Sequence, residues 1–467
     1  MVASAKKRSG QFRKQFPSPN PVNGLFMSFS ALIINPWVAD FKLYDEWMHP
    51  IGLYYLATLL QRNGAEINFI NCLERPPSQP GKPNGTGNFA SRQFPKPALY
   101  RNILRRYKLF GLSEDDLAGR LKRNIRPDVV FVGSAMTYWL PGLAETVRVI
   151  KHTLPECPIV IGGISAQLIP QAVAKACPGA FVYGGTLFDQ TALRKSGIPY
   201  LSSLPALTAN DSLIPGLSLL THANHGPALA SLGCPLRCSY CASHTLHPNF
   251  VRRPPSIVVD ELLYMRNRFR VNNFAWYDDA LLCNSEAEFI PLTDSIAAAG
   301  VKNASFHSPN GLHVRWISSS VLNAMKRIGF RTLRFGYEAG SSRFLRDTRG
   351  KTSRDELASK IELAMDEGFC GREMGVYVMA GLEDQTPVHV EEEIAFVASL
   401  SVYVKPVFLS PVPGTIVFDA YAQAFPDLLT SPLTHNDTFF VTRLPGWDAQ
   451  SIQRIMDLSK AQNAEIS

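Results

Sequence analysis

The chain has 467 residues, 46% of them hydrophobic, which is enough for two domains with ordinary buried cores. Its formal net charge is +8, but five of the positive charges lie within residues 1–14, where there is no acidic residue. The +3 that remains is too small to indicate a surface that binds phosphate backbones, so we do not expect a nucleic-acid partner. No apolar run is long enough to span a membrane and no signal peptide is recognisable, so we expect a cytoplasmic protein.

The first predicted domain covers residues 24–185 and follows a basic tail, residues 1–23, that we expect to be disordered. Apolar runs typical of strands alternate here with segments of helical period, which predicts a doubly wound, Rossmann-like parallel α/β sheet. The expected strands cover residues 26–34, 67–70, 129–133, 159–161 and 181–183, and the expected helices cover residues 51–61, 117–123, 143–152 and 168–176. Proline, glycine, asparagine and serine are dense after residue 74, which predicts an insertion over about residues 74–124.

A second domain is predicted over residues 225–420, after a linker without clear period over residues 186–224. Its apolar runs cover residues 227–232, 274–277, 304–306, 332–337, 375–379 and 402–409. Helical segments separate these runs, which predicts the parallel strands and crossover helices of a partial (β/α)6 TIM barrel. Residues 421–467 form a predicted C-terminal extension.

Cap residues mark the expected helices of this second domain. The expected N-caps are Ser256, Ser285 and Thr386, and the expected helix ends are Gly300, Gly329 and Gly368. These cap residues support the alternation of strands and helices on which the barrel prediction depends.

Three cysteines follow the first predicted strand of the barrel. Cys234, Cys238 and Cys241 have the spacing C-x-x-x-C-x-x-C. Iron–sulfur clusters are usually held by four thiolates, so three leave one iron of a four-iron cluster open to a substrate or cosubstrate. A zinc site completed by His244 or His247 is the alternative. The other cysteines are scattered without the rhythm of a disulfide framework, which indicates a reducing compartment.

This cysteine spacing, with Tyr240 just before the third cysteine, resembles the signature of the radical S-adenosylmethionine (SAM) enzymes. The resemblance implies a [4Fe–4S] cluster whose open iron binds SAM, with Tyr240 near the adenine. It also implies that Glu338, after the fourth strand, hydrogen-bonds SAM, and that Asp278 or Asp279 faces SAM or substrate. The family's frequent Gly-Gly-Glu after the second strand is replaced here by Tyr277-Asp278-Asp279.

The N-terminal domain resembles the cobalamin-binding domain that some radical SAM enzymes carry. Ser134-Ala135-Met136 and Gly162-Gly163 stand where that domain has a Ser-x-Leu and a Gly-Gly loop. In its first loop, His49 is kept but Trp47 replaces the usual Asp. A cobalt-ligating imidazole is normally oriented by a carboxylate. Three alternatives therefore stay open: cobalamin without a protein ligand, cobalamin ligated by His49, or a domain that binds no corrin.

The resemblance implies a radical reaction and leaves its product open. One-electron reduction of the cluster would cleave SAM and produce a 5′-deoxyadenosyl radical. With cobalamin, the expected reaction is methylation of an unactivated carbon; without it, a dehydrogenation, cyclisation or rearrangement. A non-catalytic zinc or iron–sulfur module is a further alternative. The enzyme would need a one-electron reductant such as flavodoxin or ferredoxin, and its substrate would be a small molecule or a peptide.

Overall fold

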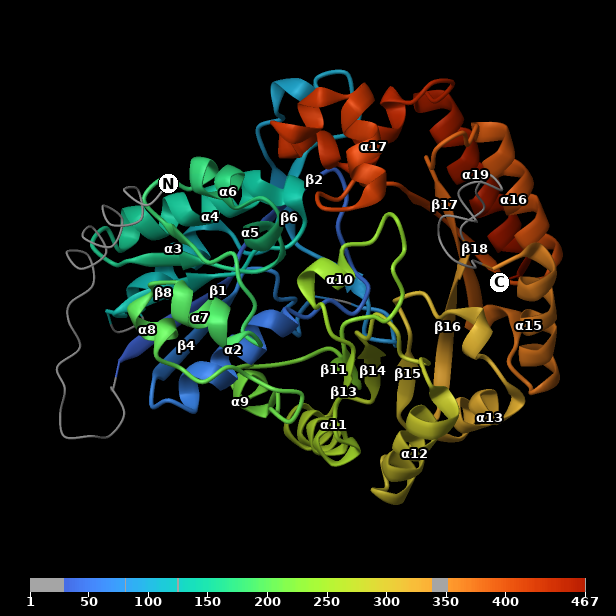
Figure 1. Cartoon of the computed structure of the whole chain (residues 1–467), viewed down its shortest axis with the longest axis horizontal. Coiled ribbons are helices and arrows are strands. Elements are labelled where there is room, and N and C mark those ends of the chain that lie inside the picture. The colour runs from blue at the N-terminus through green and yellow to red at the C-terminus, as the bar shows by residue number, and fades with distance from the viewer. Residues whose placement is uncertain (1–28, 80, 124–125, 338–351, 467) are drawn as a thin grey trace. The chain divides into compact units, whose positions relative to one another are not determined.

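The computed structural model describes residues 29–79, 81–123, 126–337 and 352–466 (Figure 1). The chain divides into two compact units: residues up to 81 with 87–223 form the first, and residues 82–86 with 224–467 form the second. The predicted disordered tail, residues 1–23, lies outside the described residues. Among the helices of the described ranges, none is long and apolar enough to cross a membrane.

The core of the first unit is a five-stranded sheet with the order β10-β9-β8-β1-β4, and all of its pairs are parallel. Its strands are β1 (Ser30–Asn35), β4 (Glu66–Asn71), β8 (Val129–Val132), β9 (Ile159–Ile161) and β10 (Phe181–Val182). The chain passes from β1 to its neighbour β4 on one side and then to β8 on the other side of β1. The order of the strands therefore reverses between β1 and β8, as the doubly wound prediction requires, and that prediction is confirmed.

Helices flank this sheet on both faces (Figure 1). They are α2 (Ile51–Gln61), α4 (Leu140–Thr153), α5 (Ile164–Leu168) and α6 (Pro170–Ala176). The helix expected over residues 168–176 is confirmed as α6, but it begins two residues later than expected, at Pro170. A residue before proline is pushed out of the helical region, and Ile169 has φ −136° and ψ 53°.

The insertion folds into strands of its own. β6 (Ser91–Gln93) and β7 (Lys108–Phe110) join β2 (Val38–Asp40) in a three-stranded antiparallel sheet. The remaining elements of this region are β3 (Tyr44–Asp45), β5 (Gly87–Asn88), η1 (Ala98–Tyr100) and α3 (Glu114–Arg123). The insertion is thereby fixed to the segment that follows β1.

Residues 186–223 pack within the first unit through short helices. These are α7 (Gln190–Lys195), α8 (Pro199–Ser202) and α9 (Ile214–Leu217). α9 lies against α2, where Gly216 comes so close that a Cβ on it would be 2.4 Å from the Cα of Tyr54. The segment predicted as an irregular linker therefore contains short helices, and its α9 packs against α2.

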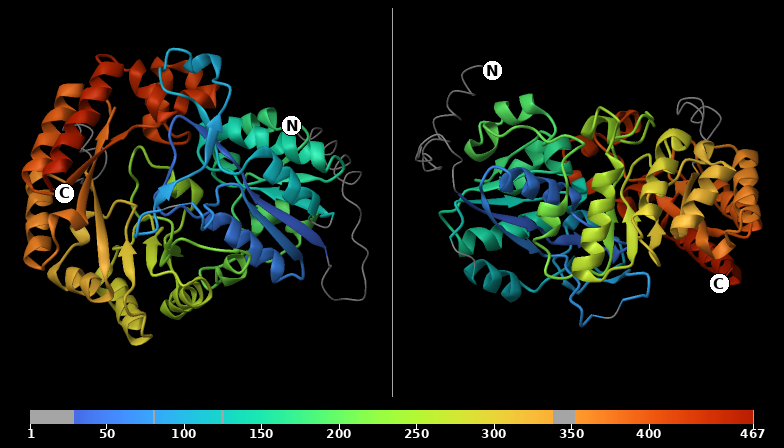
Figure 2. Two further views of the ribbon diagram at one scale, coloured as in Figure 1. Left: turned by 180° about the vertical axis from the view of Figure 1, so that it is seen from behind. Right: turned by 90° about the horizontal axis from the view of Figure 1, so that it is seen from below.

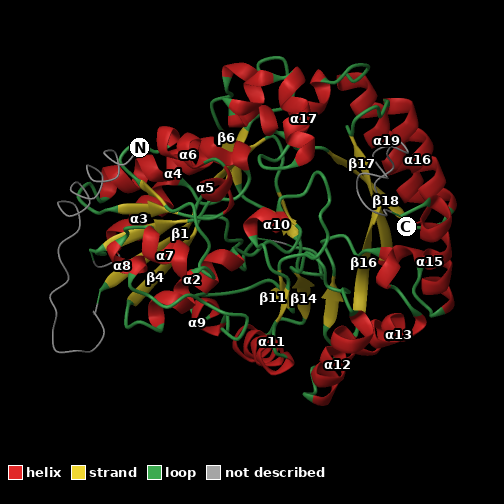
Figure 3. Ribbon diagram, in the orientation of Figure 1, coloured by secondary structure: helices red, strands yellow, loops and turns green. Residues whose placement is uncertain are grey.

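The second unit contains a six-stranded sheet with the order β11-β14-β15-β16-β17-β18, and all of its pairs are parallel. Its strands are β11 (Gly226–Ala228), β14 (Asn273–Trp276), β15 (Ser305–His307), β16 (Phe330–Tyr337), β17 (Met374–Ala380) and β18 (Tyr403–Phe408). Crossover helices lie outside the curved sheet (Figure 3): α11 (Pro255–Phe269), α12 (Ser285–Ala298), α13 (Ser319–Ile328), α15 (Arg354–Asp366) and α16 (Pro387–Ser399). This arrangement confirms the predicted partial barrel.

The expected helix ends are confirmed, since Gly300, Gly329 and Gly368 have φ of 71°, 96° and 85°. Thr386 caps α16 as expected, accepting a hydrogen bond from the backbone N–H of His389. The other expected N-caps, Ser256 and Ser285, are wrong. α11 begins at Pro255 after Pro254, and α12 follows Asn284, whose side chain bonds Glu288 instead of the helix backbone.

The C-terminal extension packs on the barrel's last strand. The predicted extension, residues 421–467, begins within α17 (Ile416–Ala424) and continues through η5 (Pro426–Leu429), η6 (Pro432–His435), α18 (Asp437–Phe440), η7 (Val441–Arg443) and α19 (Ala449–Ile466). α19 runs beside α16 in Figures 1 and 2, and Asn463 bonds both backbone polar groups of Val404 in β18. The extension thereby covers a strand edge that would otherwise be open to pairing.

Candidate functional site

The three cysteines lie in a closed loop at the carboxyl end of β11. The loop is closed by a short antiparallel pair, β12 (Ser231–Leu232) and β13 (Val251–Arg252), and contains α10 (Ser243–Leu246). Gly233 opens it with φ 73°, where an added Cβ would lie 2.5 Å from the carbonyl oxygen of Asn249. The first cysteine therefore follows a turn that only glycine fits.

The thiols lie close enough to influence one another. The pKa of Cys234 is raised to about 12, mainly by burial, and also by Asp279 and by the other two cysteines. The backbone N–H of Ser243 donates to Sγ of Cys241 at 3.5 Å, and that thiol contacts the Ser243 hydroxyl at 3.2 Å. A set of thiolates that repel one another is stabilised by shared positive charge, which is what bound iron supplies.

The donor set fits an iron–sulfur cluster by its chemistry, since thiolates are the usual ligands of such clusters. Within the described ranges, no three His, Cys, Asp or Glu residues are arranged to hold a metal ion. Neither the three cysteines alone nor the cysteines with His244 or His247 are therefore arranged around a metal ion. The pKa of His247 is lowered, mainly by burial.

The loop is tied to the C-terminal extension through Ser239. Its carbonyl accepts a hydrogen bond from the backbone N–H of Val417, at the start of α17, at 3.0 Å. Its hydroxyl is buried and has no hydrogen-bond partner among the described residues. Tyr240, beside it, is half-buried.

Asp278, predicted to face SAM or substrate, is buried just beyond β14. Its carboxylate accepts hydrogen bonds from the backbone N–H of Ala230 at 3.0 Å and from the Ser231 hydroxyl at 2.5 Å. Burial raises its pKa to about 6. The neighbouring Asp279 is exposed. Asp278 therefore supports the base of the cysteine loop, a structural position that the sequence motif does not reveal.

Other strand ends complete this face of the barrel. The Asn310 amide donates to the carbonyl oxygens of Tyr277 and Asp278, which joins the loops after β14 and β15. β16 ends at Tyr337, whose hydroxyl donates to Glu393. Glu338, the predicted SAM ligand that follows, lies outside the described residues.

In the first unit, three of the predicted cobalamin residues, Ser134, Gly162 and Gly163, meet at the carboxyl edge of the sheet. The Ser134 hydroxyl donates to the carbonyl of Gly162 at 2.7 Å and accepts from the backbone N–H of Ala166 at 3.1 Å. Gly163 has φ 98°, and a Cβ there would lie 2.3 Å from the carbonyl oxygen of Ser134. In doubly wound sheets ligands bind at this edge, where the strand order reverses, and Ser134 follows β8 at that point.

The same edge exposes apolar side chains. Met136 is 46% exposed and Ile164 is 38% exposed. At Gly162, an added Cβ would meet nothing nearer than the Tyr183 ring at 3.9 Å, so the backbone there is open to close approach. These residues fit a large, partly apolar ligand.

His49 lies before α2, and its Nδ1 is 2.9 Å from the hydroxyl of Tyr54. Sequence reasoning missed this partner. The only signal was a tyrosine five residues after the histidine. Burial raises the pKa of Tyr54, so the phenol stays neutral and does not supply the negative charge of the carboxylate that the motif lacks.

Comparison with known proteins identifies the barrel. Residues 229–397 match the family described as the Radical SAM superfamily. An uncharacterized methyltransferase of Pyrococcus horikoshii is 26% identical over 364 residues, 68% of this chain and 75% of its own length. The cytidylyl-2-hydroxyethylphosphonate methyltransferase of Streptomyces wedmorensis is 21% identical over 71% of this chain and 69% of its own. The anaerobic magnesium-protoporphyrin IX monomethyl ester cyclase of Cereibacter sphaeroides is 25% identical over 41% of this chain and 36% of its own.

Solved structures share the fold. The radical SAM methyltransferase TsrM from Kitasatospora setae, solved with cobalamin and a [4Fe–4S] cluster, has a TM-score of 0.60 at 15% identity and covers 85% of this chain and 78% of its own. The cobalamin-dependent radical enzyme OxsB has a TM-score of 0.52 at 10% identity and covers 93% of this chain and 61% of its own. Both likenesses span the two units.

Proposed function

We propose that this chain, whose residues 229–397 match the Radical SAM superfamily, methylates an unactivated carbon with the help of cobalamin, using a [4Fe–4S] cluster and SAM as its other cofactors. The observation that carries the proposal is the closed Cys234–Cys241 loop at the carboxyl end of the first barrel strand. In barrels of parallel strands, chemistry collects at that end.

We assign Cys234, Cys238 and Cys241 as ligands of the cluster. When bound and reduced, the cluster supplies the electron that splits SAM into methionine and a 5′-deoxyadenosyl radical. The chain's own residues would hold the reactants in place: the β12–β13 pair closes the loop, Asp278 supports its base and Val417 anchors Ser239. Tyr240 and Glu338 keep their predicted role as SAM contacts.

We place cobalamin at the carboxyl edge of the first unit's sheet. Ser134, Gly162 and Gly163 form a compact turn there, and the exposed Met136 and Ile164 offer apolar surface to a corrin. Methyltransferases among the relatives, and two structures of cobalamin enzymes with this fold, support the assignment. Because His49 faces a neutral phenol, we propose that the cobalt has no protein ligand.

Small-molecule methylation fits the relatives best. One is named for a cytidylyl phosphonate, and a TsrM structure was solved with tryptophan as substrate. We propose a small molecule as methyl acceptor here. The reaction needs a one-electron donor of the flavodoxin or ferredoxin type, which places it in a reducing compartment such as the cytoplasm.

A second candidate is a radical SAM reaction without cobalamin, such as a dehydrogenation, rearrangement or cyclisation. It is favoured by the Cereibacter sphaeroides relative, which is named as a cyclase, and by Trp47, which stands where the cobalamin motif has its Asp.

Metal analysis distinguishes the two candidates. The protein would be produced with iron and cobalamin supplied, purified without oxygen, and analysed for iron, sulfide, zinc and cobalt. Methylation predicts about four irons and about one cobalt per chain, whereas the second candidate predicts iron without cobalt. Stoichiometric zinc without iron would overturn both.

Replacement of one cysteine tests the cluster assignment. Cys238→Ala should abolish cluster binding and the production of 5′-deoxyadenosine from SAM under dithionite, because two thiolates do not hold the cluster. The matched control is Cys370→Ala, which removes an exposed thiol after α15 and should leave both unchanged. Wild-type cleavage of SAM by the Cys238 variant would contradict the assignment.

A further inference from the structure

The insertion of the first unit concentrates positive charge. Residues 75–113 contain eight lysines and arginines and no aspartate or glutamate. Arg75 pairs with the buried Asp45, and Arg92 lies over the Trp37 ring, so these two serve the fold. No carboxylate in the described part of the chain pairs with Lys96, Arg105 or Arg106.

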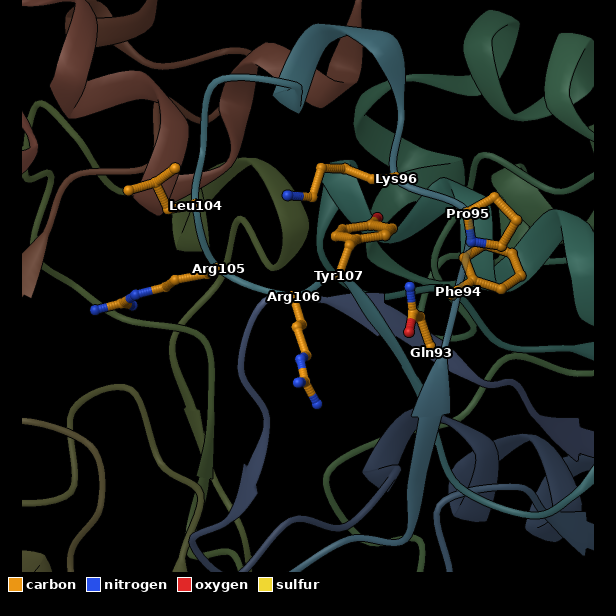
Figure 4. A pocket seen from close by; sticks show the side chains of 8 residues that line it. All are labelled: Gln93, Phe94, Pro95, Lys96, Leu104, Arg105, Arg106 and Tyr107. Atoms are coloured by element: carbon orange, nitrogen blue, oxygen red, sulfur yellow. The ribbon is translucent and has the colours of Figure 1, made fainter.

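These three cations border one cavity of about 420 Å³ (Figure 4). Among the described residues, no acidic residue lines the cavity. Its other walls are the apolar or neutral side chains of Gln93, Phe94, Pro95, Leu104 and Tyr107. Cavities of this size hold small organic ligands. Leu104 is 97% exposed, which leaves an apolar side chain in water at the mouth of the cavity.

The cavity is built on a rigid base. β6 and β7 pair directly below it, and the backbone N–H of Phe94 donates to the carbonyl of Tyr107 at 3.1 Å. Tyr107 is buried and its hydroxyl donates to the carbonyl of Ala39 at 2.9 Å. Lys96 reaches across the loop to the carbonyl of Ile103 at 2.6 Å. The loop therefore keeps its shape without a ligand.

Arg105 and Arg106 extend from this base in different directions (Figure 4). Both are exposed, so turning them towards a bound anion costs only side-chain entropy. Guanidinium groups suit phosphate because their N–H groups match its oxygens in pairs.

We propose that this cavity binds a small phosphate ester, with the anion held by Lys96, Arg105 and Arg106 and the organic part against Leu104 and Phe94. Several cations without an acid favour a dianion over a monoanion, because each adds to the attraction. The site belongs to the first unit alone, so the proposal goes beyond the radical reaction and does not depend on it.

Calorimetric titration of the full-length, cluster-loaded protein tests the site. The probes are phenyl phosphate, a dianion with an apolar ring, and benzoate, which has the same ring and one charge. Phenyl phosphate should bind with one-to-one stoichiometry and about tenfold more tightly than benzoate. Arg106→Gln should weaken its binding by about tenfold, because a charge-assisted hydrogen bond is lost.

The control is Arg101→Gln, which removes an exposed cation of the same loop that does not line the cavity. This variant should bind phenyl phosphate with an affinity within about twofold of wild type, since distant exposed charges are screened by salt. Equal losses in Arg106→Gln and Arg101→Gln would overturn the site in favour of diffuse attraction. Equal affinity for benzoate, or no binding of phenyl phosphate, would also overturn it. A second variant, Leu104→Asn, tests the apolar wall and leaves every charge in place.

Discussion

The contact between His49 and Tyr54 decides what the histidine can do for a corrin. A neutral phenol orients the imidazole without making it more basic, which weakens it as a cobalt ligand. His49→Ala should therefore leave the cobalt content per chain within about twofold of wild type after reconstitution. Gly163→Ala should lower it strongly, because the added Cβ would lie 2.3 Å from the carbonyl oxygen of Ser134. Loss of cobalt in the histidine variant alone would show that His49 is a ligand after all.

Asp278 makes stability depend on pH. Burial raises its pKa from 3.8 to about 6, so between these values the folded protein keeps a proton that the unfolded chain has released. The carboxyl therefore lowers the free energy of unfolding as pH rises through this window, by roughly 3 kcal/mol in total.

Asp278→Asn should remove that dependence and still accept the hydrogen bond from Ala230. We expect the variant to gain stability relative to wild type between pH 4 and pH 7, measured by urea unfolding. Asp279→Asn, an exposed neighbour, is the control and should follow wild type. The prediction would be refuted if the free energies of unfolding of Asp278→Asn and wild type differed by the same amount at pH 4 and at pH 7.

Among the helices, the caps show where local sequence rules hold. Thr386 precedes Pro387, and its hydroxyl accepts from the N–H of His389 at the start of α16. Ser256 has the same residue type that helix starts favour, but α11 already begins one residue earlier, at Pro255. Proline fixes the backbone angle of the first helical turn, so the serine falls inside the helix.

Two variants compare these serine and threonine positions. Thr386→Ala should lower the free energy of unfolding by about 1 kcal/mol, the usual value of an N-cap. Ser256→Ala should change it by less than about 0.5 kcal/mol, since the side chain is exposed within the helix. Chemical denaturation of both variants checks the pair, and equal losses would contradict the assignment of the caps.

Over the whole molecule, hydrophobic period predicted both parallel sheets because their strands are buried, apolar and separated by helices. The expected strand over residues 159–161 coincides with β9. The antiparallel sheet of the insertion was not predicted, because β2, β6 and β7 have three residues each and depend on partners far apart in the chain. Such short strands gain their stability from tertiary pairing and leave little periodic signal.

For the candidate site, the sequence predicted residue types better than contacts. The cysteine spacing and the glycine pair are local patterns, readable from the chain. The bonds of Asp278 to Ala230 and of His49 to Tyr54 follow from the packing of separate segments. Net charge also concealed the basic stretch over residues 75–113, because acidic residues elsewhere in the chain offset its eight cations.

The second unit cannot be made from a single stretch of chain. Residues 82–86 belong to it: the amide of Asn273 donates to the carbonyl of Pro83 at 3.0 Å, and a Cβ on Gly85 would lie 2.7 Å from the carbonyl oxygen of Asn224. During synthesis this segment leaves the ribosome well before β14 does, so it must wait for its partners while the first unit is still incomplete. A fragment that starts at residue 224 would lack it, and a protease that cuts there would not release a complete barrel.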